Sequence, residues 1–189
     1  MNVYDFDDTI YDGESCLDLF KFYVKKNPKL LVHLPGVLLG FLKYKRGKIT
    51  IESMMTKYAA DVGGFFASIP DVEADMVEFW DTHMDRIRPF YKEIQRDDDL
   101  IITGSPEFSM KIICARLGIK NYITSDIDTK TGEIRHFNIR HNKIKAFFEQ
   151  YPDAQVDNFY TDSPVNDQPL IDIAKSAFVV KGNKITQIK

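Results

Sequence analysis

The N-terminal stretch "NVYDFDDTIYDG" (residues 2–13) contains four aspartates that directly follow a short apolar run. The run over residues 1–6 predicts a buried strand. Alternate residues of a strand point to the same side, so Asp5 and Asp7 share one space if extended geometry continues through Phe6. Carboxylates this close repel one another. A pattern that costs stability in this way indicates a functional site at the end of the first strand.

Apolar runs and helical segments alternate along the C-terminal half of the chain. The runs predict strands at 100–103, 121–124, 156–161 and 177–180, and the segments between them predict helices near 106–117, 142–150 and 164–174. Such alternation favours a mainly parallel sheet covered on both faces. The sequence therefore predicts an α/β fold with a doubly wound, Rossmann-like core.

Local signals mark the ends of these helices. Serine before proline at 105–106 and at 163–164 predicts two N-caps, and Gly118 predicts the end of the first helix. The segment 126–139 predicts a hairpin around Thr131 and Gly132.

Residues 14–95 have a different character and separate the first strand from the second. Apolar side chains recur at helical spacing in three stripes: Leu17-Phe20-Val24, Ile51-Met54-Tyr58-Val62 and Val72-Met76-Phe79-His83-Ile87. We expect a small helical domain here, inserted into a core made of residues 1–13 and 96–189. Trp80 is interpreted as part of the insert's own core.

Composition restricts the classes of function. A formal net charge of −3 gives no general attraction to nucleic acid. Cys16 and Cys114 are interpreted as buried thiols of a reducing compartment, and no secretory signal is visible at the start, so we expect a cytoplasmic protein. The apolar segment 29–42 is shorter than the ~20 residues of a spanning helix, and a buried segment is favoured over a membrane contact. The basic run 43–48 is interpreted as a solvated helix end rather than an anion grip.

Polar residues gather where the predicted strands end. Thr103 and Gly104 follow the second strand, Asp162 follows the fourth, and Asp167 comes five residues later. Ligands of open parallel sheets bind beyond these carboxyl ends, so the residues join Asp5 and Asp7 in one crevice. Oxygen ligands without a nearby His or Cys indicate Mg²⁺.

Four motifs in order resemble the haloacid dehalogenase superfamily. They are D-x-D-x-T at 5–9, a strand ending in Thr103, Lys143 opening a helix, and D-x-x-x-x-D at 162–167. The helical insert looks like the C1 cap of the phosphoserine-phosphatase-like branch. The resemblance implies an α/β core with an inserted cap that opens and closes through hinges near 11–15 and 85–99.

The resemblance also implies a role for each motif residue. Asp5 is the expected nucleophile, and Asp7 is the expected acid and base. Thr103, Gly104 and Lys143 are expected to bind the phosphoryl group.

The expected magnesium ligands are Asp5, the carbonyl of Asp7 and Asp162. Asp167 is expected to act through water or to orient Lys143, and Asn166 is an alternative for it. Glu14 is a candidate substrate contact, whereas Asp8 and Asp12 are interpreted as solvated or capping acids.

The resemblance therefore implies a Mg²⁺-dependent phosphatase acting on a small phosphorylated metabolite, with phosphoserine as one candidate. Two alternatives stay open at this point. One is a lipid-phosphate phosphatase of the phosphatidylglycerophosphate type, suggested by the segment 29–42 beside the basic run. The other is a module that binds a phosphorylated ligand without catalysis. The sequence names neither the substrate nor the oligomeric state.

Overall fold

The computed structural model describes residues 1–33 and 69–189, together with 35, 36, 39, 43, 48, 49, 53, 57 and 65. The predicted stripe Ile51-Met54-Tyr58-Val62 lies outside the described residues, as do most of the basic run 43–48 and much of the segment 29–42. The sheet and the helices that pack on it lie within residues 1–33 and 69–189.

A seven-stranded sheet in the order β4-β3-β2-β1-β5-β6-β7 forms the centre of the fold. Its strands are β1 (Val3–Tyr4), β2 (Leu100–Pro106), β3 (Asn121–Ile127), β4 (Ile134–His136), β5 (Asn158–Thr161), β6 (Ser176–Lys181) and β7 (Lys184–Gln187). Val3 pairs in parallel with Leu100 of β2 and Phe159 of β5, so β1 is the central strand. Among the described strands, only the edge strands β4 and β7 pair antiparallel. The predicted, mainly parallel sheet is confirmed.

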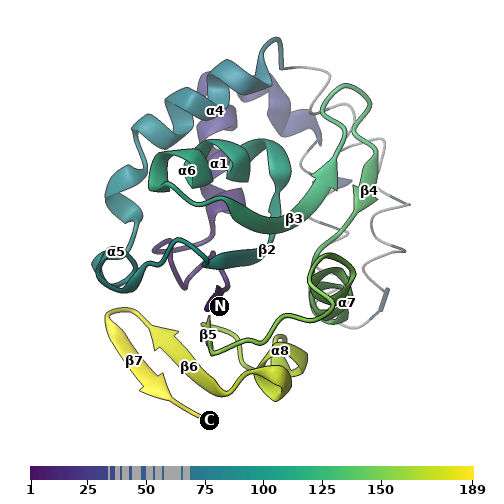
Figure 1. The fold of residues 1–189 in the computed structure, drawn as a ribbon. Coiled ribbons are helices and arrows are strands. Elements are labelled where there is room, and N and C mark those ends of the chain that lie inside the picture. Colours follow the sequence, from purple (N-terminus) through teal and green to yellow (C-terminus); the bar gives the residue numbers. More distant parts are fainter. Residues whose placement is uncertain are drawn as a thin grey trace.

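Helices pack on both faces of the sheet. They are α1 (Ser15–Lys26), α4 (Val72–Asp81), α5 (Pro89–Ile94), α6 (Glu107–Leu117), α7 (His141–Gln150) and α8 (Gln168–Ile173), with 3₁₀ helices η1 (Pro28–His33) and η2 (Met84–Arg86). Tyr4 and Ile101 belong to one buried cluster with side chains of α6, whereas Val3 and Ile102 belong to another with side chains of α7 and α8. In Figure 1, α1, α4 and α6 lie together above β2 and β3, and α7 and α8 lie below. Successive side chains of β1 and β2 thus point to opposite faces of the sheet, and helices cover both faces, as expected for a doubly wound core.

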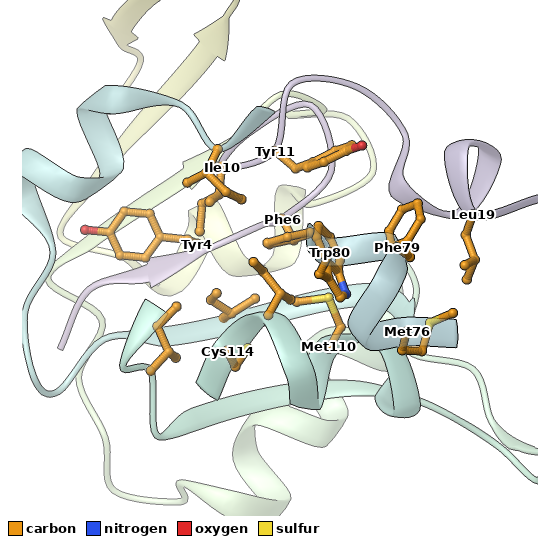
Figure 2. Close-up of a cluster of buried hydrophobic side chains, with 14 of the residues drawn as sticks. Tyr4, Phe6, Ile10, Tyr11, Leu19, Met76, Phe79, Trp80, Met110 and Cys114 are labelled. Atoms are coloured by element: carbon orange, nitrogen blue, oxygen red, sulfur yellow. The ribbon is translucent and has the colours of Figure 1, made fainter. Parts of the chain in front are cut away.

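Trp80 of α4 joins the helices of the 14–95 segment to the sheet. Its ring makes edge contacts with Phe6 at 6.0 Å and Tyr11 at 5.7 Å between centroids (Figure 2). Its indole Nε1 donates a hydrogen bond of 3.0 Å to the carbonyl of Ser109 in α6. Trp80 is therefore buried against the sheet and α6 rather than only within the predicted insert.

The inward face of α1 differs from the predicted stripe. Leu19 and Tyr23 are buried, whereas Leu17 is 52% exposed. Polar contacts set this orientation, because Asp18 accepts a hydrogen bond of 3.0 Å from the hydroxyl of Tyr11. Phe20 and Val24 of the predicted stripe are half-buried, so only Leu17 is misplaced.

Two of the three predicted helix ends are wrong. Pro106, not Ser105, occupies the N-cap of α6, because Ser105 remains within β2. α8 begins at Gln168, and the Ser163 carbonyl instead closes a turn with the N–H groups of Asn166 and Asp167. The third end is confirmed, since Gly118 has a φ of 73° at the C-cap of α6.

The remaining local predictions have mixed outcomes. The hairpin is confirmed, with Asp126 of β3 paired to His136 of β4. Both cysteines are free thiols, but only Cys114 is buried and Cys16 is exposed in the first turn of α1. No helix within the described ranges has the length and hydropathy that a membrane span requires.

Candidate functional site

Asp5 lies at the carboxyl end of the central strand. Its N–H donates a hydrogen bond of 2.9 Å to the carbonyl of Tyr160, which extends the pairing of β1 with β5 by one residue. Asp5 shares a sheet face with Val3, the face that α7 covers. From α7, the Nζ of Lys143 reaches the Oδ1 of Asp5 at 2.8 Å, and both residues are buried.

The two acids after β5 complete this buried group. Lys143 Nζ lies 3.0 Å from Oδ1 of Asp167, whose Oδ2 accepts a hydrogen bond of 2.7 Å from the hydroxyl of Thr161. The carboxyl of Asp162 adjoins that of Asp5. The fold thus brings together Asp5, Lys143, Asp162 and Asp167.

Negative charge exceeds positive charge in this group. Burial raises the pKa of Asp5 to about 8, and Asp167 and Asp7 act in the same direction, against the opposing effect of Lys143. Burial also raises the pKa of Asp162, with Asp8 and Asp167 adding to it. Burial opposes the charge of Lys143, but Asp5 and Asp167 outweigh burial and raise the pKa of Lys143. A single ammonium group does not neutralise three neighbouring carboxyls.

A divalent cation fits this imbalance and the kind of donors present. The described residues contain no group of three or more His, Cys, Asp or Glu side chains arranged as metal ligands. Asp5 and Asp162 nonetheless offer two adjoining carboxyls. Mg²⁺ is held in proteins by one or two carboxylates, with water and substrate phosphate as its other ligands. The donors present therefore suit magnesium.

The carboxylate of Asp7 is held by two other elements. Its Oδ1 accepts a hydrogen bond of 2.7 Å from the N–H of Ser15, at the start of α1. Its Oδ2 accepts one of 2.6 Å from the hydroxyl of Ser105, at the end of β2. Burial raises the pKa of Asp7, and the hydrogen bonds from Ser105 and Ser15 oppose this rise.

Thr103 and Gly104 lie in the stretch of β2 where its pairing with β3 is interrupted. The register of the two strands shifts between Ile102 and Pro106. The Nδ2 of buried Asn138 donates to the Thr103 carbonyl at 3.0 Å and bridges this break. A Cβ on Gly104 would lie 2.8 Å from Cγ2 of Ile139, so only glycine fits the close approach. Asn138 and Ile139 therefore pack directly against this stretch of β2.

The other candidates are exposed and lie outside this group. Glu14 is exposed immediately before α1. Asn166 is exposed and lines an open groove of about 350 Å³ with Arg140 and His141. The side chain that contacts Lys143 is that of Asp167. Asp12 forms an ion pair of 2.8 Å with Arg88.

Four residues that contact the candidate residues were not predicted to belong to the site: Ser15, Ser105, Thr161 and Asn138. Ser105 carried a signal, since it lies two residues after Thr103, but serine before proline is also typical of a helix cap. Asn138 follows an irregular hairpin and carried none.

Solved structures with the same fold resemble the chain over more than nine-tenths of its length. A protein with unknown function from Bordetella pertussis Tohama I has a TM-score of 0.69 and 19% identity, covering 94% of this chain and 87% of that one. A phosphoserine phosphohydrolase-like protein from Francisella tularensis has a TM-score of 0.62 and 18% identity, covering 94% and 86%. A phosphoserine phosphatase solved as a phospho-aspartyl intermediate analogue has a TM-score of 0.54 and 14% identity, covering 93% and 83%.

A comparison with curated protein sequences gives no match. The family description that does match is that of the haloacid dehalogenase-like hydrolases, over residues 3–172. This span includes every residue of the four motifs, and it confirms the resemblance drawn from them. The chain belongs to the haloacid dehalogenase-like hydrolase family.

Proposed function

We propose that the protein is a phosphatase that hydrolyses a small phosphomonoester through a covalent aspartyl-phosphate on Asp5. The observation that carries the proposal is the buried contact of Lys143 with Asp5, beside Asp162, at the carboxyl end of the central strand. Phosphoryl transfer mainly requires that the protein position the reacting groups and neutralise their charge. A buried carboxylate beside a fixed ammonium group offers both.

The first step is attack on phosphorus. A carboxylate oxygen of Asp5 forms a bond to phosphorus while the bond to the leaving oxygen breaks, which gives the aspartyl-phosphate. Asp7, in its protonated form, gives its proton to that leaving oxygen, and the alcohol departs. Lys143 balances the negative charge of Asp5 and of the phosphoryl group.

The second step releases phosphate and restores the site. Asp7, now ionised, takes a proton from a water molecule as that water attacks phosphorus. The bond between phosphorus and Asp5 breaks, and inorganic phosphate leaves. Thr103 and the N–H groups near Gly104 hold the phosphoryl oxygens in both steps.

The donor set also gives magnesium a place in the proposal. Asp5, Asp162 and the carbonyl of Asp7 would hold Mg²⁺, which supplies positive charge to the phosphoryl group when bound. Asp167 holds Lys143 in position through their contact of 3.0 Å. Glu14, at the start of α1, is proposed to face the substrate.

The substrate enters between the core and the proposed C1 cap, residues 14–95. The phosphoserine phosphatases among the structural neighbours favour a small phosphorylated metabolite. A lipid phosphate is the second candidate, favoured by the exposure of Leu31 (43%) and Val32 (73%) in η1. Co-sedimentation with anionic vesicles tests it, since a lipid phosphatase should bind them and a metabolite phosphatase should stay in solution.

Hydrolysis of p-nitrophenyl phosphate by the purified protein tests the proposed reaction. We expect turnover with Mg²⁺, loss of turnover on chelation, and loss in Asp5→Asn. A protein that binds phosphate esters stoichiometrically without turnover would instead be a binding module. Full activity in Asp5→Asn would overturn the assignment of the nucleophile.

A further inference from the structure

We propose that Ser105 is a positioning residue that holds the carboxylate of Asp7 in line with the leaving oxygen. The inference rests on the proposed function and adds a residue to it. Its basis is the hydrogen bond of 2.6 Å from Ser105 Oγ to Asp7 Oδ2, formed by a serine that is 2% exposed.

The surroundings of Ser105 direct its proton towards Asp7. Its Oγ lies 3.0 Å from the hydroxyl of Ser15 and 3.4 Å from the Sγ of Cys16. A hydroxyl has one proton to donate and two lone pairs that accept. Because the Asp7 carboxylate only accepts when ionised, Ser105 donates to it and accepts from Ser15 or Cys16.

Asp7 is thereby held from two sides. The N–H of Ser15 fixes Oδ1 from α1, and Ser105 fixes Oδ2 from β2. Two bonds to two oxygens determine the rotation of the carboxylate about its Cβ–Cγ bond. One bond alone leaves that rotation open, so each serine is needed for a defined orientation.

Ser105 also links Asp7 to Thr103, the proposed phosphoryl contact. Its N–H donates a hydrogen bond of 3.1 Å to the Oγ1 of Thr103. The segment 103–105 thus carries the proposed phosphoryl contact at one end and the support of Asp7 at the other. This arrangement fixes the distance between the bound phosphoryl group and the group that protonates its leaving oxygen.

The leaving group provides the test, because only a poor leaving group needs a proton during attack. p-Nitrophenolate departs without one, whereas the alkoxide of glycerol 2-phosphate requires it. The value of kcat/KM reports the steps through formation of the aspartyl-phosphate. We expect Ser105→Ala to lower kcat/KM for glycerol 2-phosphate about tenfold and for p-nitrophenyl phosphate less than about twofold. Asp7→Asn should show the same pattern more strongly.

Three variants serve as comparisons. Ser105→Thr keeps the hydroxyl and should restore the ratio of the two kcat/KM values. Ser15→Ala keeps the backbone N–H that binds Asp7, so its ratio should fall less than that of Ser105→Ala. Ser109→Ala removes another buried hydroxyl of the same region and should leave the ratio unchanged. Circular dichroism melting of each variant checks that it folds.

The outcomes separate the inference from the proposed function. A selective loss on glycerol 2-phosphate, reversed by threonine, supports the positioning role. Equal losses on both substrates, or none, would overturn it while the wild-type protein still turns over. A wild-type protein that hydrolyses neither ester would defeat the proposed function, and the inference with it.

Discussion

The ammonium group of Lys143 lies 2.8 Å from Oδ1 of Asp5, although the two residues are 138 positions apart in the sequence. The contact joins the end of β1 to the first turn of α7, and both side chains are almost fully buried. Removing one partner of a buried pair leaves the other charge without compensation. The pair therefore contributes both to stability and to the proposed chemistry.

Lys143→Met should damage stability and activity together. We expect the free energy of unfolding to fall by about 3 kcal/mol, because Asp5 and Asp167 lose their shared cation. Turnover should fall on the order of 100-fold or more. Urea unfolding and steady-state kinetics measure the two effects. Lys145→Met, on the exposed side of the same helix, is the matched control and should change neither.

Mg²⁺ should stabilise the folded protein even without substrate. A cation that binds the folded chain alone raises the melting temperature as its concentration increases, and saturation at 100 times Kd corresponds to about 2.7 kcal/mol. Asp162→Asn should lose most of this response, whereas Asp172→Asn, an exposed acid of α8, should keep it. Thermal melting across a Mg²⁺ titration decides the matter. An undiminished response in Asp162→Asn would remove that residue from the ligand set.

Asp99 should make stability depend on pH, far from the site. Burial raises its pKa to about 6, above the ordinary value of 3.8, and its Oδ1 has no hydrogen-bond partner among the described residues. The folded state therefore favours the protonated acid. The stability that protonated Asp99 contributes is fully present below the ordinary pKa of 3.8. It is lost as the pH rises through the folded-state pKa of about 6.

Asp99→Asn should remove this dependence. Relative to the variant, the wild-type protein should lose about 2 kcal/mol of stability between pH 4 and pH 7. Urea unfolding at the two pH values measures the difference, with Asp97→Asn, an exposed acid, as the control. Parallel behaviour of wild type and Asp99→Asn at both pH values would contradict the assignment.

Trp80 should contribute strongly to the attachment of α4. Trp80→Phe removes the hydrogen bond to the Ser109 carbonyl and part of the ring volume between Phe6 and Tyr11. We expect a loss of about 2 kcal/mol in chemical denaturation. Val77→Ala, at a 41% exposed position of α4, should cost less than about 0.5 kcal/mol. Similar losses in the two variants would argue against the packing role.

The sequence predicted the sheet and the group around Asp5 because both follow from strong local patterns. Apolar runs such as 100–103 can be satisfied only by burial on two faces, and chain order then brings Asp162 next to Asp5. Helix ends were harder to predict. Ser105 resembles an N-cap when only the neighbouring residues are considered, but its hydroxyl donates a long-range hydrogen bond to Asp7.

The burial of Leu17 in α1 was mispredicted for a similar reason. Leu17 has the hydropathy of a core residue, but the contacts of Ser15 with Asp7 and of Asp18 with Tyr11 orient the helix. Polar contacts between distant residues leave no periodic trace in a sequence. Asn138 is the clearest case, since its side chain donates hydrogen bonds to Thr103 of β2 and Ile123 of β3 where the pairing of the two strands is interrupted.

The most direct test of the central claim is to trap the enzyme during turnover and find where the phosphoryl group is attached. Acid quenching of wild-type protein with substrate and Mg²⁺, followed by peptide mass spectrometry, should give one added phosphoryl group on the peptide that contains Asp5. Asp7→Asn should accumulate more of this adduct from p-nitrophenyl phosphate, because it lacks the base for its hydrolysis. An adduct on another residue, or rapid turnover in Asp5→Asn, would contradict the account.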